Sequence, residues 1–303
     1  MNTMNELEFW QIDVFTTRRY QGNPAAVVFE AADLTTEVMQ AIAREMNLSE
    51  TVFVQPPVAA GADYKVRMFT PRSEMPFAGH PTLATAYAMV NRGGGFQGVV
   101  PLHLRQECGI GIVPVEVRRS ADGSLTFVMT QASPRWIDVP ITRAACAALL
   151  GCASEDVLDL PIQVVSTGVP WLIIPLRAPA DVAGLRPDAA GIERTCRQYG
   201  AVGVTTFAIG AEDAATQVKV RTFAPGEGVS EDPVCGSGNG SVAAYIAATS
   251  LLGGADFAYE AQQGIEVARP GTVLVRCERR PDGNLQVSVG GHAVKVLEGT
   301  LFL

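Results

Sequence analysis

The feature that most constrains this sequence is a strand, a glycine-containing loop and an apolar helix that occur twice in the same order. The first copy spans residues 66–90 and the second spans residues 220–252. In both copies the helical stretch is apolar on every side rather than along one stripe. A helix of this kind belongs in a protein interior rather than on a surface. The repeat therefore predicts two matching halves, each built around a buried helix.

Further segments recur in the same order, which indicates an internal duplication of the whole chain. Gly22–Val28 recurs as Gly168–Ile174, Glu50–Val54 as Thr205–Ile209, Arg67-x-Phe69-x-Pro71 as Arg221-x-Phe223-x-Pro225, and Asp122-Gly123-x-Leu125 as Asp282-Gly283-x-Leu285. Each half offers several strands and one long apolar helix, and strands that curl around the helix would bury it. A doubly wound sheet needs helices of comparable length that alternate with the strands, and the sequence does not show them.

Composition excludes several classes of function. The chain has 303 residues, of which 48% are hydrophobic, so it has ample material for a core. A net charge of -8, with no basic run longer than two residues, argues against a nucleic-acid partner. No apolar stretch approaches the about 20 residues of a membrane helix, and residues 1–8 lack the positive and apolar pattern expected of a secretion signal. The six cysteines form no CxxC or zinc-like pattern with the three histidines. We therefore expect a metal-free, cytoplasmic protein that contacts no membrane.

The two glycine loops are candidate anion-binding sites. Gly79 and the segment Gly236–Gly238 each precede a helix, whose first N–H groups and positive dipole end favour an anion. The segment fits neither common nucleotide-binding pattern, because Ser241 stands where the last glycine would be. Alternatively, these glycines only allow a helix to pass close to strands. Two loops that face one cleft would favour binding of a small anionic metabolite.

Glu50, His80 and Asp232 are the candidate acid and base residues. Glu50 lies between a helix and a strand and matches Thr205 in the other half, so the two halves differ there. A carboxylate in an apolar cleft has its neutral form favoured, which suits proton transfer near neutral pH. His80 follows Gly79 at a helix start, where the dipole disfavours its protonated form. A surface glutamate, a backbone-bonded histidine and a turn-capping aspartate are the alternatives.

Cys235 is the remaining reactive candidate, and its counterpart in the first half is Ala78. A symmetric racemase with one thiol from each half is therefore not available to this chain. The helix N-terminus that follows Cys235 could lower the pKa of its thiol. A small buried cysteine is the alternative role.

Several motifs occur together over essentially the whole chain: Asp13-Val14-Phe15, Gly22-Asn23-Pro24, Asn47–Thr51, Phe69-Thr70-Pro71, Pro76–Thr82 and Glu231–Gly238. In this combination the chain resembles the PhzF family of phenazine biosynthesis-like isomerases. The resemblance implies an α+β, diaminopimelate epimerase-like fold with two pseudo-symmetric domains, each a curled, barrel-like sheet around a central apolar helix. We expect the halves at residues 1–130 and 131–293, with residues 294–303 returning to the first half and the active cleft between them.

The resemblance also implies a function for the candidate residues. Glu50 is similar to the family's catalytic acid/base, with His80 and Asp232 beside the substrate. The substrate contacts implied are Ser49, Gly79, Gly236, Ser237 and Gly238. The expected activity is a cofactor-independent isomerisation of a small carboxylate metabolite, resembling that of trans-2,3-dihydro-3-hydroxyanthranilate. No cofactor or metal is implied, and a homodimer is expected.

One departure from the family pattern leaves the chemistry open. The second glycine loop retains an epimerase-like cysteine, Cys235, where the phenazine enzyme has a different residue. A racemase, epimerase or dehydratase that uses Cys235 with a second base is therefore an alternative. A non-catalytic metabolite-binding protein on the same fold is another, and the physiological substrate is not predicted.

Overall fold

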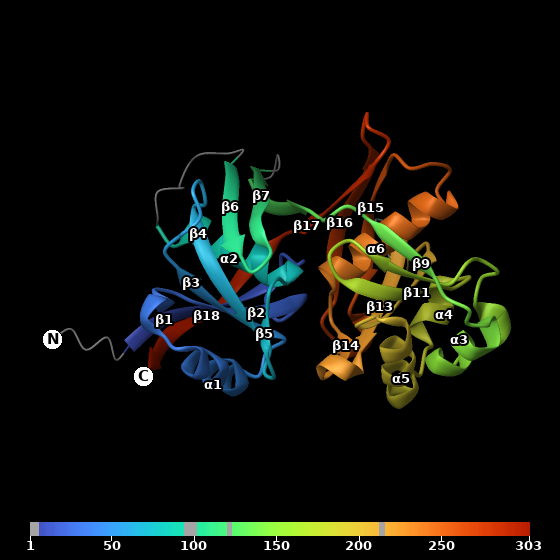
Figure 1. Cartoon of the computed structure of the whole chain (residues 1–303), viewed down its shortest axis with the longest axis horizontal. Helices are drawn as coiled ribbons and strands as arrows, with labels where there is room; N and C mark the ends of the chain where they lie inside the picture. Colours follow the sequence, from blue (N-terminus) through green and yellow to red (C-terminus); the bar gives the residue numbers. More distant parts are fainter. Residues whose placement is uncertain (1–5, 94–101, 120–122, 212–215) are drawn as a thin grey trace. The chain divides into compact units, whose positions relative to one another are not determined.

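The computed structural model of the chain describes residues 6–93, 102–119, 123–211 and 216–303, so Asp122 of the repeated turn lies outside these ranges. The chain divides into two compact units, drawn mainly in blue to cyan and in green to orange in Figure 1. Unit 1 comprises Met1–Met129 and Gly290–Leu303, and unit 2 comprises Thr130–Val289. The C-terminal strand thus belongs to the same unit as the N-terminal one.

Unit 1 contains a mixed sheet in which β18, β1, β2, β3, β4, β6, β7 and β8 are successive neighbours. Of these pairs, β2–β3 and β4–β6 are parallel, and helices cross over between their strands, as parallel neighbours require. The elements are β1 (Glu6–Val14), β2 (Asn23–Val28), η1 (Ala31–Asp33), α1 (Thr36–Met46), β3 (Glu50–Gln55), β4 (Tyr64–Phe69), β5 (Glu74–Met75), α2 (Gly79–Asn91), β6 (Leu102–Cys108), β7 (Gly111–Arg119), β8 (Leu125–Thr130) and β18 (Ala293–Phe302).

Unit 2 repeats this pairing pattern. Strands β9, β10, β11, β12, β13, β15 and β16 are successive neighbours, and the parallel pairs are β11–β12 and β13–β15. The elements are β9 (Arg135–Asp138), α3 (Arg143–Leu150), η2 (Ser154–Asp156), β10 (Gln163–Ser166), β11 (Pro170–Pro175), α4 (Pro179–Ala183), α5 (Ala189–Tyr199), β12 (Gly203–Ile209), β13 (Val218–Ala224), η3 (Pro225–Glu227), β14 (Val229–Asp232), α6 (Gly236–Thr249), β15 (Phe257–Gln263), η4 (Ile265–Val267), β16 (Gly271–Arg279) and β17 (Leu285–Gly291).

The two apolar helices are the buried centres of their units, as the sequence predicted. Helix α2 contacts β1, β2, β3, β7 and β18, and α6 contacts β10, β11, β12 and β16. Both are buried on all sides in their first two turns, where alanine, glycine and threonine allow strands to approach closely. Helix α1 instead buries one face through Met39 and Ala43. The result is an α+β fold rather than a doubly wound sheet. None of the helices within the described ranges has the length and apolarity needed to cross a bilayer.

The residue pairing between neighbouring strands shows which residue of unit 2 corresponds to Glu50. In unit 1, Ala25 of β2 lies opposite Glu50 of β3. In unit 2, Trp171 of β11, which corresponds to Ala25 in the repeat, lies opposite Gly203 of β12. The match of Glu50 with Thr205 was therefore wrong by two residues, because similar side chains recur at alternate positions of the strand. Glu50 corresponds to Gly203.

Gly203 leaves no room for a side chain at this position of unit 2. A Cβ on Gly203 would lie 2.2 Å from the carbonyl oxygen of Phe223 and 2.7 Å from the Trp171 ring. Contacts this short require the backbone to move. The carboxylate of Glu50 thus belongs to unit 1 alone, and packing prevents an equivalent group in unit 2.

Candidate active site

Glu50 and His80 lie together in unit 1. Glu50 is the first residue of β3 and His80 is the second residue of α2. Glu50 Oε2 lies 3.3 Å from His80 Nε2, and the two side chains are 17% and 7% exposed. His80 Nε2 also lies 3.3 Å from the carbonyl oxygen of Pro24. The start of β3 beside β2 and the start of α2 therefore bring a carboxylate, an imidazole and a carbonyl to one point.

The His80 imidazole is neutral at pH 7. Burial lowers its pKa to about 3, against the opposing effect of the hydrogen bond to Pro24. The direction agrees with the sequence analysis, but the main cause is burial rather than the helix dipole. Because the Pro24 oxygen can only accept, Nε2 carries the hydrogen of the neutral ring. The contact of 3.3 Å with Glu50 Oε2 is therefore the close approach of a neutral ring rather than an ion pair between two full charges.

Ser49 and Gly79 lie next to this pair along the chain. Ser49 Oγ is 3.5 Å from Oδ1 of Asn23, a fully buried residue. Gly79 is the first residue of α2, and Ala78 is its N-cap. No side chain of the described residues caps the first turn of α2, which also holds no acidic residue. This helix start is suited to an anion. In the sequence Asn23 stands out only as part of the Gly22-Asn23-Pro24 motif, and its burial next to Ser49 was not visible from that pattern.

In unit 2, Asp232 and the second glycine loop form an ordered helix start. Asp232 ends β14, and its Oδ1 accepts a hydrogen bond of 3.2 Å from the Val234 N–H. Ser237 Oγ accepts one of 3.0 Å from Trp171 Nε1. A Cβ on Gly238 would lie 2.8 Å from Thr205 Oγ1, so glycine is required for this approach. Asp232 and Gly238 thus have structural roles beside any role in binding.

The Cys235 thiol is protonated, contrary to the expected effect of the helix N-terminus. Burial raises its pKa well above the ordinary value, with the negative charge of Asp232 as the next cause. Hydrogen bonds from Ser237 and Gly238 oppose this shift without reversing it. Cys235 is 5% exposed and is the N-cap of α6, where its Sγ accepts the Gly238 N–H at 3.3 Å.

Within the described residues, no group of three or more His, Cys, Asp or Glu side chains is arranged to hold a metal ion. The acid and base candidates occur instead as the Glu50–His80 pair of unit 1 and as Asp232 beside Cys235 in unit 2.

Comparison with known proteins decides the family. The family model for phenazine biosynthesis-like proteins, PhzC-PhzF, matches residues 12–299. The chain belongs to this family. A trans-2,3-dihydro-3-hydroxyanthranilate isomerase of Pseudomonas chlororaphis is 34% identical, over 96% of this chain and 98% of the relative. Antisense-enhancing sequence 1 of Schizosaccharomyces pombe is 32% identical, over 99% of this chain and 100% of the relative.

Solved structures agree with this assignment. The PhzF-family phenazine biosynthesis protein of Bacillus anthracis has a TM-score of 0.88 and 28% identity, and covers 99% of this chain and 100% of its own. A hydroxyproline epimerase of Agrobacterium vitis, at 13% identity and a TM-score of 0.61 over 100% of this chain and 94% of its own, shares the fold alone. The family and its named relatives identify the chain as an isomerase of this family, whose substrates are small molecules.

Proposed function

We propose that this protein moves a proton, and with it a double bond, within a small carboxylate-bearing metabolite, with Glu50 as the single acid/base and without a cofactor. The observation that carries the proposal is the contact of 3.3 Å between Glu50 and the neutral His80 in a largely buried setting. The substrate class follows the relatives named for isomerisation of trans-2,3-dihydro-3-hydroxyanthranilate.

The chemistry uses the carboxylate twice. Glu50 takes a proton from one carbon of the substrate, and the electron pair of that C–H bond moves into the conjugated system. The protonated Glu50 then gives a proton to another carbon, which restores the carboxylate. The neutral His80 ring lies 3.3 Å from Glu50 Oε2 and limits where the carboxylate can move. Burial disfavours the protonated form of His80, so the proton removed from the substrate stays on Glu50.

The difference between the units favours this isomerisation over an inversion. One carboxylate that removes and returns a proton suits transfer along one face of a substrate, whereas inversion needs two groups on opposite faces. The position of Glu50 is occupied in unit 2 by Gly203, which has no acid or base. Cys235 as the second base would have to ionise, and burial and the charge of Asp232 oppose this.

The substrate contacts proposed are Ser49 and Gly79 in unit 1 and Asp232, Gly236, Ser237 and Gly238 in unit 2. The N-terminal N–H groups of α2 and α6 suit the carboxylate of the substrate. The assignment of Asp232 and Ser237 rests on the family resemblance, together with their places at the start of α6. We also propose a homodimer, which light scattering of the purified protein would test.

Turnover of trans-2,3-dihydro-3-hydroxyanthranilate, followed by proton NMR, tests the proposal. Glu50→Gln keeps the shape of the side chain and removes its basicity, so we expect a loss of about 10²- to 10⁴-fold, the usual contribution of a general base. Glu45→Gln, an exposed glutamate of α1, is the matched control and keeps wild-type turnover. Normal turnover by Glu50→Gln would refute the role of Glu50. Binding of the compound by the wild-type protein without any turnover would support the non-catalytic alternative.

A further inference from the structure

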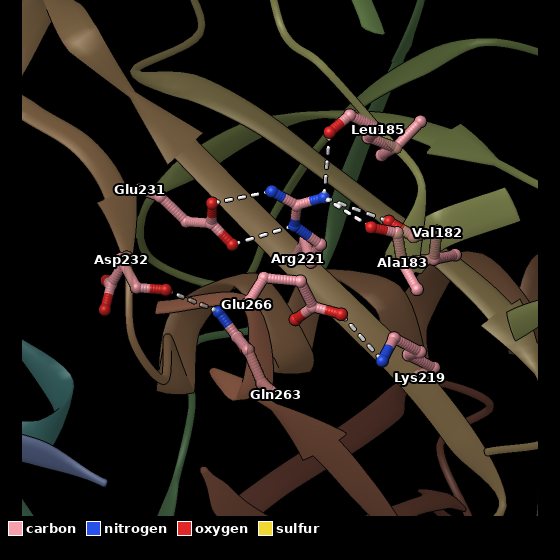
Figure 2. A network of polar contacts seen from close by, with 9 residues as sticks. All are labelled: Val182, Ala183, Leu185, Lys219, Arg221, Glu231, Asp232, Gln263 and Glu266. Atoms are coloured by element: carbon pink, nitrogen blue, oxygen red, sulfur yellow. Dashed lines mark hydrogen bonds and ion pairs between the residues drawn. The ribbon is translucent and has the colours of Figure 1, made fainter. Parts of the chain in front are cut away.

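Gln263 connects the strand before the second glycine loop with the helix after it. It ends β15 and is 1% exposed. Its Nε2 donates to the carbonyl oxygen of Asp232 at 3.0 Å, a contact drawn in Figure 2. Its Oε1 accepts the Cys235 N–H at 3.2 Å and Asn239 Nδ2 at 2.9 Å. A single buried amide thus joins the last residue of β14, the N-cap of α6 and the first turn of α6.

Only one orientation of the Gln263 amide fits these partners. The Asp232 carbonyl can only accept, and the two groups that meet Oε1 are both N–H donors. A flipped amide would place a carbonyl against a carbonyl and donors against donors. Every polar atom of the side chain therefore has a defined partner, and the geometry of the loop depends on all of them.

A second contact holds the strand on the other side of Asp232. Arg221 of β13 makes a bidentate pair with Glu231, with distances of 2.8 and 2.7 Å. Arg221 Nη1 donates to the carbonyl oxygens of Val182, Ala183 and Leu185, so the guanidinium is fixed at the end of α4 (Figure 2). Asp232 thus lies between Glu231, which is held by Arg221, and the Gln263 amide, which bonds its own carbonyl oxygen.

Unit 1 contains a simpler version of the same arrangement. The fourth residue after the N-cap bonds the N-cap carbonyl in both helices: Thr82 Oγ1 bonds Ala78, and Asn239 Nδ2 bonds Cys235. Gln106 of β6 then donates to Thr82 Oγ1 at 2.9 Å, and it is as buried as Gln263. Among the described residues, Gln106 Oε1 has no hydrogen-bond partner. Gln106 therefore supports a helix without joining it to the preceding strand.

We propose that Gln263 is a positioning residue that fixes the Asp232 carboxylate relative to the first turn of α6, and so sets the affinity for an aromatic or cyclic carboxylate. The inference rests on the proposed function, because it takes Asp232 and Gly236–Gly238 as substrate contacts. It goes beyond that function in giving a residue outside the substrate contacts control over binding.

Gln263→Met tests this inference, because methionine has a similar length and no amide. Two properties are measured: the affinity for 3-hydroxyanthranilate by isothermal titration calorimetry, and hydrogen–deuterium exchange of residues 234–240 by mass spectrometry. We expect an affinity about tenfold lower, equivalent to one or two hydrogen bonds of about 1 kcal/mol each, together with faster exchange of this segment. Gln106→Met is the matched control for the loss of a buried amide. It keeps the affinity within about twofold and leaves the exchange of residues 234–240 unchanged.

Where Asp232→Asn lowers the affinity, wild-type affinity in Gln263→Met would overturn the inference, as would an equal loss of affinity in Gln106→Met. Asp232→Asn separates this failure from a failure of the proposed function. If Asp232→Asn keeps the wild-type affinity, or if the wild-type protein does not bind 3-hydroxyanthranilate, the proposed substrate contacts are wrong. Hydrogen–deuterium exchange of residues 234–240 alone then decides whether Gln263 holds this loop in place. Faster exchange in Gln263→Met supports it, and wild-type exchange overturns it.

Discussion

The buried His80 should make the folded protein sensitive to mild acid. Its pKa is about 3 in the folded protein and about 6.5 in the unfolded chain, so between these values the unfolded chain binds a proton that the folded protein does not. Stability therefore rises with pH through this window, by about 1.4 kcal/mol per pH unit, and is lost as pH falls below 6.5. Between pH 7.5 and pH 5.0 the loss due to His80 is about 2 kcal/mol.

His80→Gln removes this titration and keeps a side-chain N–H donor. Urea unfolding at pH 7.5 and pH 5.0 measures the effect on the free energy of unfolding. We expect the difference between wild type and variant to change by about 2 kcal/mol in favour of the variant at the lower pH. His103→Gln, at an exposed position of β6, should keep the wild-type pH dependence. If His80→Gln and wild type lose equal stability, the imidazole is not buried in its neutral form and the reasoning is wrong.

Three further predictions concern the packing around Gly203, the ion pair of Arg221 and the Cys235 thiol. Gly203→Ala should lower the free energy of unfolding by about 3 kcal/mol, whereas Gly254→Ala, where a Cβ meets open space, should be nearly neutral in urea unfolding. Arg221→Lys should lower the free energy of unfolding by about 3 kcal/mol, because it breaks the buried bidentate pair with Glu231. Arg67→Lys, in the more exposed pair with Glu74, should lower it by at most about 1 kcal/mol in the same assay. Cys235→Ala should lose about 1 kcal/mol with the N-cap but keep its turnover in the NMR assay, and a loss of turnover comparable to that of Glu50→Gln would contradict the structural role of the thiol.

The duplication and the two buried helices could be predicted from the sequence, because apolar residues on every side of a helix leave it no surface position. The α+β class was implied by the family resemblance, and the comparisons with solved structures agree with it. The counterpart of Glu50 was misassigned to Thr205 because strand residues alternate between faces, and a shift of two residues preserves that alternation. Only the register with the neighbouring strand distinguishes Gly203 from Thr205.

The electrostatics of the site could be predicted only in part. The neutral state of His80 was anticipated, but its cause is burial, which depends on residues far away in the sequence. The same burial raises the pKa of the Cys235 thiol and outweighs the helix N-terminus on which the sequence argument relied. Gln263 gave no signal, because its importance comes from the contact of β15 with the end of β14.

Transfer of solvent deuterium tests most directly whether Glu50 is the single acid/base. The wild-type protein, Glu50→Gln and Cys235→Ala are each incubated in D2O with trans-2,3-dihydro-3-hydroxyanthranilate, and NMR follows deuterium at the carbons of substrate and product. The account predicts isomerised product from the wild type and from Cys235→Ala, and neither product nor exchange from Glu50→Gln. Exchange that persists in Glu50→Gln and disappears in Cys235→Ala would contradict it.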